Sequence, residues 1–262
     1  SNHSSGWLLY YKLKKIMAIS VDTVYQKILA LANKEQRGYI TPQEFNLFAD
    51  QAQKEIFEQY FYDVNQFKRV PGNSTDYSNI LNNLEEKISL FERYSIKVRL
   101  ANKYGDVKAL PKDLYRLGTV RVRYKSEPRT RVAEELQLNE LNKYGDSPLT
   151  TWTRKRPIYT RYSRADGADN LKIYPYPSSD LTVDQVLIDY IRTPKSPNWS
   201  YIIINDKALY NENESIDFDL HPSEESELVN RILAMTGIAI EKPQLTSIAM
   251  GLETAKVQQE KA

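Results

Sequence analysis

The stretch RGYITPQEFNLFADQAQKEIFEQYF, residues 37–61, predicts a turn followed by one long amphipathic helix. Gly38 is placed to end a preceding helix, and Thr41, Pro42 and Glu44 have the spacing of a capping box with proline at the first helical position. Apolar side chains then recur at the spacing of one helix face. They are Phe45, Phe48, Ala49, Ala52, Ile56 and Tyr60, with Gln43, Asp50, Gln53, Lys54 and Glu58 on the polar remainder. This pattern is typical of a core-packing helix and carries no catalytic group.

Further helices are predicted on both sides of this one, and strands between them. Apolar periodicity predicts helices over 21–31, 80–91 and 228–237, and a last one that begins at Pro243, with a loop over 69–78. The alternation in TVRVRYK (119–125) places Val120, Val122 and Tyr124 on one side of a half-buried strand. The other strand-like runs are 94–100, 156–163, 170–177, 184–194 and 199–206, and helix formers that end on a glycine predict a short helix within 131–145.

These elements predict an α+β fold in which N- and C-terminal helices form a helical bundle around an inserted, mainly antiparallel β domain. The bundle comprises residues 17–93 and 220–262, and the β-rich insertion with its one short helix comprises 94–219. Residues 1–16 have an apolar patch before their lysines and do not resemble a secretory signal. We expect them to be a non-native or disordered leader, with translation starting at Met17.

Composition limits the chemistry of the 262-residue chain. It has no cysteine, so disulfides and thiolate catalysis are excluded, and its two histidines cannot form a multi-histidine metal site in one subunit. His221 lies before Pro222, where a helix-capping role is expected, and the nearby carboxylates do not have EF-hand spacing. The nine glycines form no phosphate-binding loop. We therefore expect no enzyme, no catalytic residue, no metal and no cofactor, although paired carboxylates for glycoside cleavage are not ruled out by sequence.

Charge is uneven along the chain. Residues 93–164 hold 18 Lys and Arg against 7 Asp and Glu, whereas residues 205–262 hold 5 against 11. Basic and acidic faces of neighbouring copies would complement each other, and the alternative is two solvated faces without a partner. The stretch TWTRKRPIYTRYSR (151–164) mixes arginines with aromatic rings, so single-stranded nucleic acid bound through residues 152–164 is a second hypothesis. The net charge of +2 is low for such a binder.

Six stretches in order resemble head-to-tail connector proteins, the ring or adaptor proteins of crAss-like and related marine short-tailed phages. They are residues 37–61, LPKDLYRLGTVRV (110–122) with SPLTTWTRKRPIY (147–159), LKIYPYP (171–177) with VLIDYIRTPKSPNW (186–199), and HPSEESELVNRILAMTGIAIEKPQL (221–245). The resemblance implies a virion structural protein in the neck, made in the host cytoplasm. It implies a ring of identical subunits below the portal that continues the DNA channel and docks the tail.

The implied partners are copies of the chain, the portal, tail or other neck proteins, and genomic DNA that passes without sequence-specific contact, with no membrane. We expect the helices of residues 37–61 and 222–233 to pack on the portal or a neighbour, and residues 116–190 to meet tail proteins. Another virion component, such as a tail-tube or minor capsid protein, is the alternative. The 19 tyrosines suit extensive contacts. Candidate interface residues are Phe45, Phe48, Tyr60, Arg121, Arg123, Trp152, Arg154, Arg156, Tyr159 and Trp199.

Overall fold

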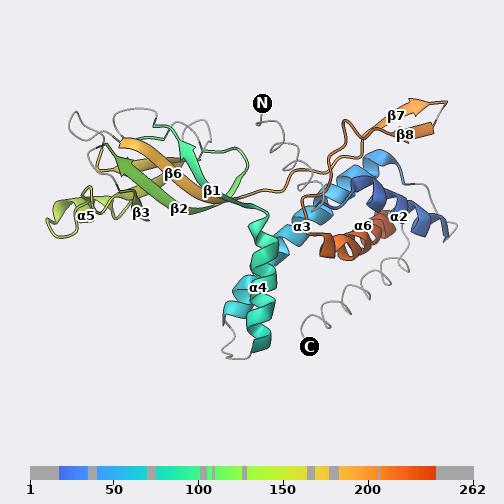
Figure 1. The fold of residues 1–262 in the computed structure, drawn as a ribbon, viewed down its shortest axis with the longest axis horizontal. Coiled ribbons are helices and arrows are strands. Elements are labelled where there is room, and N and C mark those ends of the chain that lie inside the picture. The colour runs from blue at the N-terminus through green and yellow to red at the C-terminus, as the bar shows by residue number, and fades with distance from the viewer. Residues whose placement is uncertain are drawn as a thin grey trace, which may run out of the picture. The chain divides into compact units, whose positions relative to one another are not determined.

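The chain is a mixed α+β protein with two compact units (Figure 1). The computed structural model describes residues 18–34, 40–69, 75–100, 105–107, 110–125, 129–163, 169–176, 183–205 and 207–239. Unit 1 comprises Ser1–Leu90 and Pro194–Ala262, and unit 2 comprises Phe91–Thr193. Unit 2 is therefore inserted into unit 1. The expected leader 1–16, the helix end at Gly38 and the helix from Pro243 lie outside the described residues.

The described residues of unit 1 form helices and one hairpin. Helix α3 packs on α4 and α6, and α2 packs on α6. The hairpin strands pair antiparallel, with Ile202 opposite Leu209 and Ile203 opposite Ala208. Thr75–Ser78 belong to α4 rather than to the predicted loop over 69–78. The elements are α2 (Val21–Lys34), α3 (Pro42–Arg69), α4 (Thr75–Ser89), β7 (Tyr201–Ile204), β8 (Lys207–Tyr210), the 3-10 turn η1 (Pro222–Glu224) and α6 (Glu225–Ala239).

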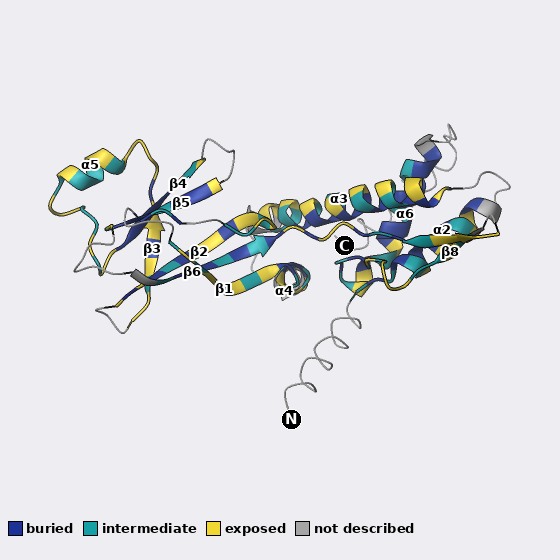
Figure 2. Cartoon of the chain, turned by 90° about the horizontal axis from the view of Figure 1, so that it is seen from above, coloured by how far each residue is buried: buried dark blue, intermediate teal, exposed yellow. Residues whose placement is uncertain are grey.

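Helix α3 begins as the sequence predicts. The backbone N–H of Thr41 donates to Glu44 Oε2 at 3.0 Å, and the N–H of Glu44 donates to Thr41 Oγ1 at 3.3 Å, which completes the capping box. The bond from the Thr41 backbone holds the pKa of the Glu44 carboxyl below its usual value. Figure 2 shows buried and exposed residues alternating along α3, as one-sided packing requires. The predicted face is buried throughout except for the half-buried Phe48.

The chain segment before α6 returns across α3 and buries polar side chains. Gln53, assigned by its sequence position to the polar face, is fully buried. Its Nε2 donates to the Lys195 carbonyl at 2.7 Å, and its Oε1 accepts from the Asp219 N–H at 2.9 Å. The prediction for Gln53 was wrong because a distant segment with unpaired backbone groups packs there, and a buried amide satisfies both kinds of group.

In unit 2 the described residues form a curled six-stranded sheet and one short helix. The strand order is β1-β6-β2-β3-β4-β5, and every pair is antiparallel except β3 with β4. The entering and leaving strands β1 and β6 are neighbours, and the Arg192 N–H donates to the Phe91 carbonyl at 2.9 Å. The elements are β1 (Glu92–Val98), β2 (Leu114–Tyr124), β3 (Arg131–Glu135), α5 (Leu141–Asp146), β4 (Ile158–Ser163), β5 (Asp169–Tyr174) and β6 (Val183–Arg192).

The alternation of strand β2 is confirmed. Val120, Val122 and Tyr124 are fully buried, while Arg121 is half-buried and Arg123 is exposed. The buried side chains join those of β5 and β6 in one apolar cluster on the inner face of the sheet. This one-sided burial accounts for the period-two pattern from which the strand was predicted.

Two predictions for the β region need correction. Residues 131–135 form strand β3. Of the stretch 131–145, in which a short helix was predicted, only residues 141–145 are helical, as part of α5. Pairing of β3 between β2 and β4 overrides the helix propensity of its residues, since Val120 lies opposite Ala133 in the ladder. The hairpin over 201–210 belongs by contact to unit 1, although the sequence placed residues 94–219 together. Trp199, just before the hairpin, packs on Tyr25 of α2, and Tyr201 stacks on Trp199.

One terminal strand of the sheet is covered by its own unit. Residues 105–107 lie antiparallel beside β5, the last strand in the sheet order. The Ile173 N–H donates to the Gly105 carbonyl at 3.0 Å, and the Val107 N–H donates to the Leu171 carbonyl at 2.9 Å. Gly105 has φ of +81°, and a Cβ there would lie 2.2 Å from the Ile173 carbonyl oxygen. Only glycine fits this approach. The other terminal strand, β1, has β6 as its one ladder partner within the described part of the chain.

Candidate interaction surface

Four of the ten candidate interface residues are buried in the chain's own core. Phe45 is 0%, Trp199 3%, Tyr60 4% and Tyr159 4% exposed. A side chain so enclosed contributes to the stability of its own unit and has no surface to offer a partner. The prediction for these four was wrong, because an amphipathic pattern marks a face that will be covered without indicating what covers it.

Trp199 shows how such a residue is enclosed. Its ring lies 4.4 Å from that of Tyr25, which lies 4.7 Å from that of Phe45. The indole N–H donates to Asp22 Oδ1 at 2.9 Å, and the backbone N–H donates to Asn46 Oδ1 at 2.7 Å. The tryptophan therefore attaches the start of the hairpin segment to α2 and α3.

Arg121 is held within its own sheet. Its Nη2 lies 2.6 Å from Asp189 Oδ1, and its Nη1 donates to the Tyr94 hydroxyl at 2.7 Å. The guanidinium lies 4.3 Å above the Tyr94 ring, so the pair combines a hydrogen bond with a cation–π contact. The Asp189 carboxylate also accepts from the Ser95 N–H at 2.8 Å, next to a bulge in β1. Arg121 thus fixes the outward position of Tyr94, which is 72% exposed.

The basic aromatic segment 152–164 makes contacts within unit 2. The ring of the half-buried Trp152 lies 5.0 Å from the Tyr174 ring. A Cβ added to Gly145 would lie 3.0 Å from the Trp152 ring. Two arginines lie 3.3 Å from carboxylates of strand β3, in the pairs Arg156–Glu134 and Arg161–Glu135. Arg154 is half-buried and Arg156 exposed. These contacts leave less aromatic surface for stacking with bases and less positive charge for binding phosphates than the nucleic-acid hypothesis requires.

Tyr159 gives the stability of unit 2 a dependence on alkaline pH. Burial, and a 3.0 Å bond from its hydroxyl to Glu135 Oε2, raise the pKa of Tyr159 well above the ordinary value. The pKa of Tyr159 in the folded chain exceeds its unfolded-state value of about 10. The stabilisation by the protonated hydroxyl is therefore complete below about pH 10 and is lost as the pH rises further. In urea titrations from pH 8 to 11, we expect Tyr159→Phe to lose less stability above pH 10 than wild type. Tyr62→Phe, at a 67% exposed position, is the matched control. Equal alkaline losses in wild type and Tyr159→Phe would contradict the prediction.

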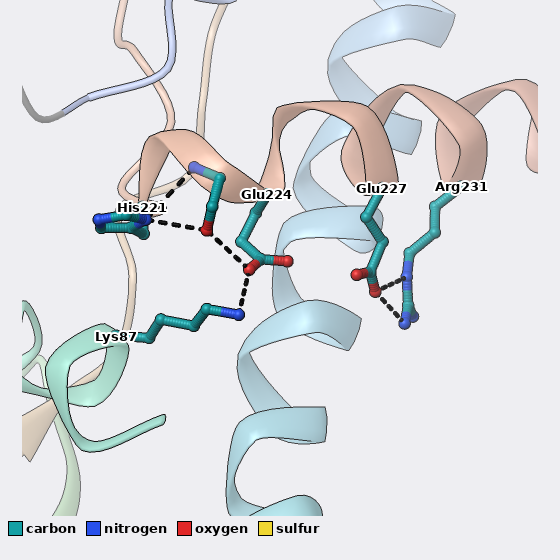
Figure 3. Close-up of polar contacts among 6 residues, drawn as sticks. Lys87, His221, Glu224, Glu227 and Arg231 are labelled. Carbon is teal, nitrogen blue, oxygen red and sulfur yellow. Dashed lines mark hydrogen bonds and ion pairs between the residues drawn. The ribbon is translucent and has the colours of Figure 1, made fainter. Parts of the chain in front are cut away.

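The acidic residues around His221 have structural partners (Figure 3). His221 accepts the Ser223 N–H at 3.3 Å on Nδ1 and lies 2.9 Å from the Ser223 hydroxyl, so it caps η1 as the sequence predicts. Glu224 binds Lys87 at 2.5 Å and the Ser223 hydroxyl at 3.1 Å. Because Ser223 bridges the histidine and the carboxylate and Nδ1 accepts a backbone bond, this arrangement is a helix cap and not a Ser-His-acid triad.

The remaining carboxylates of this segment also stabilise unit 1. Glu227 binds Arg231 at 2.7 Å on α6, and Arg231 further contacts Gln59 of α3. Asp217 Oδ1 accepts the Val21 N–H at 3.0 Å at the start of α2, and Asp219 Oδ2 accepts the Lys195 N–H at 2.9 Å. They position backbone and helices. Among the described residues, no group of three or more His, Asp or Glu could hold a metal ion.

The surface that the sequence did not single out is the hairpin. Ile202, Ile203, Ile204 and Leu209 are 53%, 67%, 51% and 49% exposed. Ile202, Ile204 and Leu209 share one face, whereas Ile203 lies on the other, because successive strand residues alternate. The tip is therefore apolar on both faces, while the Trp199 ring stacks at 5.8 Å on Tyr201 and Tyr210 at its base. The run of three isoleucines was visible in the sequence, but it was interpreted only as a strand-like run within residues 199–206.

No protein-family model matches this chain, and a search of curated proteins found no match. Within the described ranges, none of the helices is long and apolar enough to cross a bilayer.

Proposed function

We propose that this chain is a non-enzymatic virion structural protein, the subunit of a head-to-tail connector ring below the portal of a tailed phage. The observation that carries the proposal is the hairpin with exposed isoleucines on both faces. A two-stranded hairpin is at best marginally stable alone in water, and contiguous exposed apolar side chains mark association surfaces. The six ordered stretches that resemble connector proteins support the phage assignment.

The charge of the two units supports assembly from copies. Unit 2 has 20 Lys and Arg against 13 Asp and Glu, a net charge of +7, whereas unit 1 has 16 against 21, a net charge of −5. Complementary charge on one polypeptide orients copies head to tail, and a head-to-tail contact that closes by rotation forms a ring. Electrostatic steering of this kind weakens with salt.

We assign the parts as follows. Helices α2, α3, α4 and α6 form a helical bundle that packs on the portal or on a neighbouring subunit. The sheet of unit 2 meets tail or other neck proteins, and genomic DNA passes through the ring channel without sequence-specific contact. The partners are proteins of the particle rather than a membrane, and the subunit is present in the host cytoplasm during assembly and in the virion neck afterwards.

Electron microscopy of the particle that contains this chain tests the proposal. We expect a closed ring of this subunit directly below the portal, with DNA in its channel. The same chain found as a stacked tail tube or at the capsid shell would assign it to another virion component. Its absence from mature particles, or turnover of a substrate by the purified chain, would refute the proposal.

A further inference from the structure

The two faces of the β7–β8 hairpin differ in what covers them. Tyr201 and Tyr210 share one face with Ile203 and stack on Trp199, so unit 1 covers part of that face itself. The other face carries Ile202, Ile204 and Leu209, which are 53%, 51% and 49% exposed. A strand with apolar side chains on both faces is the pattern of a strand enclosed on both sides.

The surroundings of the hairpin are acidic. Residues 198–220 contain Asp206, Glu212, Glu214, Asp217 and Asp219 against one basic residue, Lys207. Glu212 and Glu214 are exposed in the turn that follows β8. The occupant of the apolar tip therefore has to tolerate or neutralise carboxylates at its rim, which favours a basic surface.

Unit 2 presents such a surface on the outer face of its sheet, defined by Tyr94, Lys97, Arg121 and Arg123. Lys97 of β1 and Arg121 of β2 both lie opposite Leu187 of β6, so the three side chains form one row across the sheet. Tyr94 is held over Arg121, and Arg123 follows two residues later on the same side of β2. Lys97 and Arg123 are exposed. Tyrosine, arginine and the aliphatic stems of basic side chains are the groups that receive apolar side chains at protein interfaces.

We infer that the β7–β8 hairpin of one copy docks on the outer sheet face of a second copy of this chain. Ile202, Ile204 and Leu209, which share one face of the hairpin, pack on Tyr94, Leu187 and the stems of Lys97 and Arg123, and the carboxylates of Glu212 and Glu214 face Lys97 and Arg123. The contact is heterologous, because the donating and receiving surfaces differ. The inference deepens the proposed function and rests on it for the closed ring, but the docking itself is tested without any phage component.

The test uses two full-length variants, each lacking one side of the contact. Ile202→Asp removes the donating side, and Lys97→Glu with Arg123→Glu removes the receiving side. By sedimentation velocity over a range of concentrations, wild type is expected to form oligomers, and each variant to self-associate at least about thirty-fold more weakly. An equimolar mixture of the two variants is expected to form a dimer and to stop there, because it has one intact hairpin and one intact face.

Leu138→Asp is the matched control, since Leu138 is 61% exposed and Ile202 is 53% exposed. It is expected to leave oligomerisation unchanged, and circular dichroism is expected to show all variants folded. Oligomers that survive Ile202→Asp, or a mixture that stays monomeric, would overturn the inference. A monomeric wild type would also overturn it, and a lower melting temperature of Ile202→Asp would then show that the chain covers its own hairpin. Oligomers that form by this contact but are absent from phage necks would refute the proposed function alone.

Discussion

Phe45→Ala is expected to lower the free energy of unfolding of unit 1 by about 3–5 kcal/mol. Phe45 is 0% exposed, and its ring lies 4.7 Å from that of Tyr25, which in turn contacts Trp199. Truncation to alanine removes apolar contacts and leaves a cavity between α2, α3 and the segment that contains Trp199. Urea denaturation followed by far-ultraviolet circular dichroism measures the loss, because unit 1 contains most of the helical residues.

Leu47→Ala is the control for Phe45→Ala. Leu47 lies two residues further along α3 and is 67% exposed, so its truncation is expected to change stability by no more than about 0.5 kcal/mol. The comparison also separates a core role from an interface role. If Phe45→Ala left the unfolding midpoint unchanged and instead abolished oligomerisation, the assignment of Phe45 to the core would be wrong.

Lys87→Ala is expected to lower the free energy of unfolding by about 3 kcal/mol. The Glu224 side chain is 3% exposed and that of Lys87 19%, and their charged groups lie 2.5 Å apart. Removal of the lysine takes the ion pair at 2.5 Å away from a buried carboxylate, and the neutral Ser223 hydroxyl that donates to the same oxygen does not replace a cation. The pair joins α4 to the start of α6, so the same urea titration reports its loss.

Lys54→Ala provides the comparison for Lys87→Ala. Lys54 also binds a carboxylate, Asp50, at 2.5 Å, but its side chain is 56% exposed, so the expected change is at most about 0.5 kcal/mol. The double variant Lys87→Met with Glu224→Gln is expected to recover part of the loss, because it also removes the buried negative charge that Lys87 neutralises. Equal effects of Lys87→Ala and Lys54→Ala would show that burial does not strengthen the Lys87–Glu224 pair.

Local patterns predicted local structure well in this chain. The capping box at Thr41, the alternation of Val120, Val122 and Tyr124, and the cap at His221 depend on residues close in sequence, and all three are confirmed. The mixed α+β class with a mainly antiparallel sheet followed from the same patterns.

Contacts between distant segments could not be predicted in this way. The polar Gln53 is buried because backbone from residues 195–219 crosses α3, and nothing near Gln53 indicates this. Residues 131–135 form a strand because two other strands pair with them. For the candidate site, periodicity identified faces that are covered but assigned Trp199 and Tyr159 to partners, when the chain itself covers them.

The insertion of unit 2 has a consequence for how the protein can change over time. Unit 2 begins and ends on neighbouring strands, with Phe91 and Arg192 joined by a backbone hydrogen bond. A segment whose two ends lie side by side can be exchanged, enlarged or trimmed while the host fold keeps its connections. Sequence drift in the sheet can therefore adapt the protein to new neighbours without rebuilding the helical part.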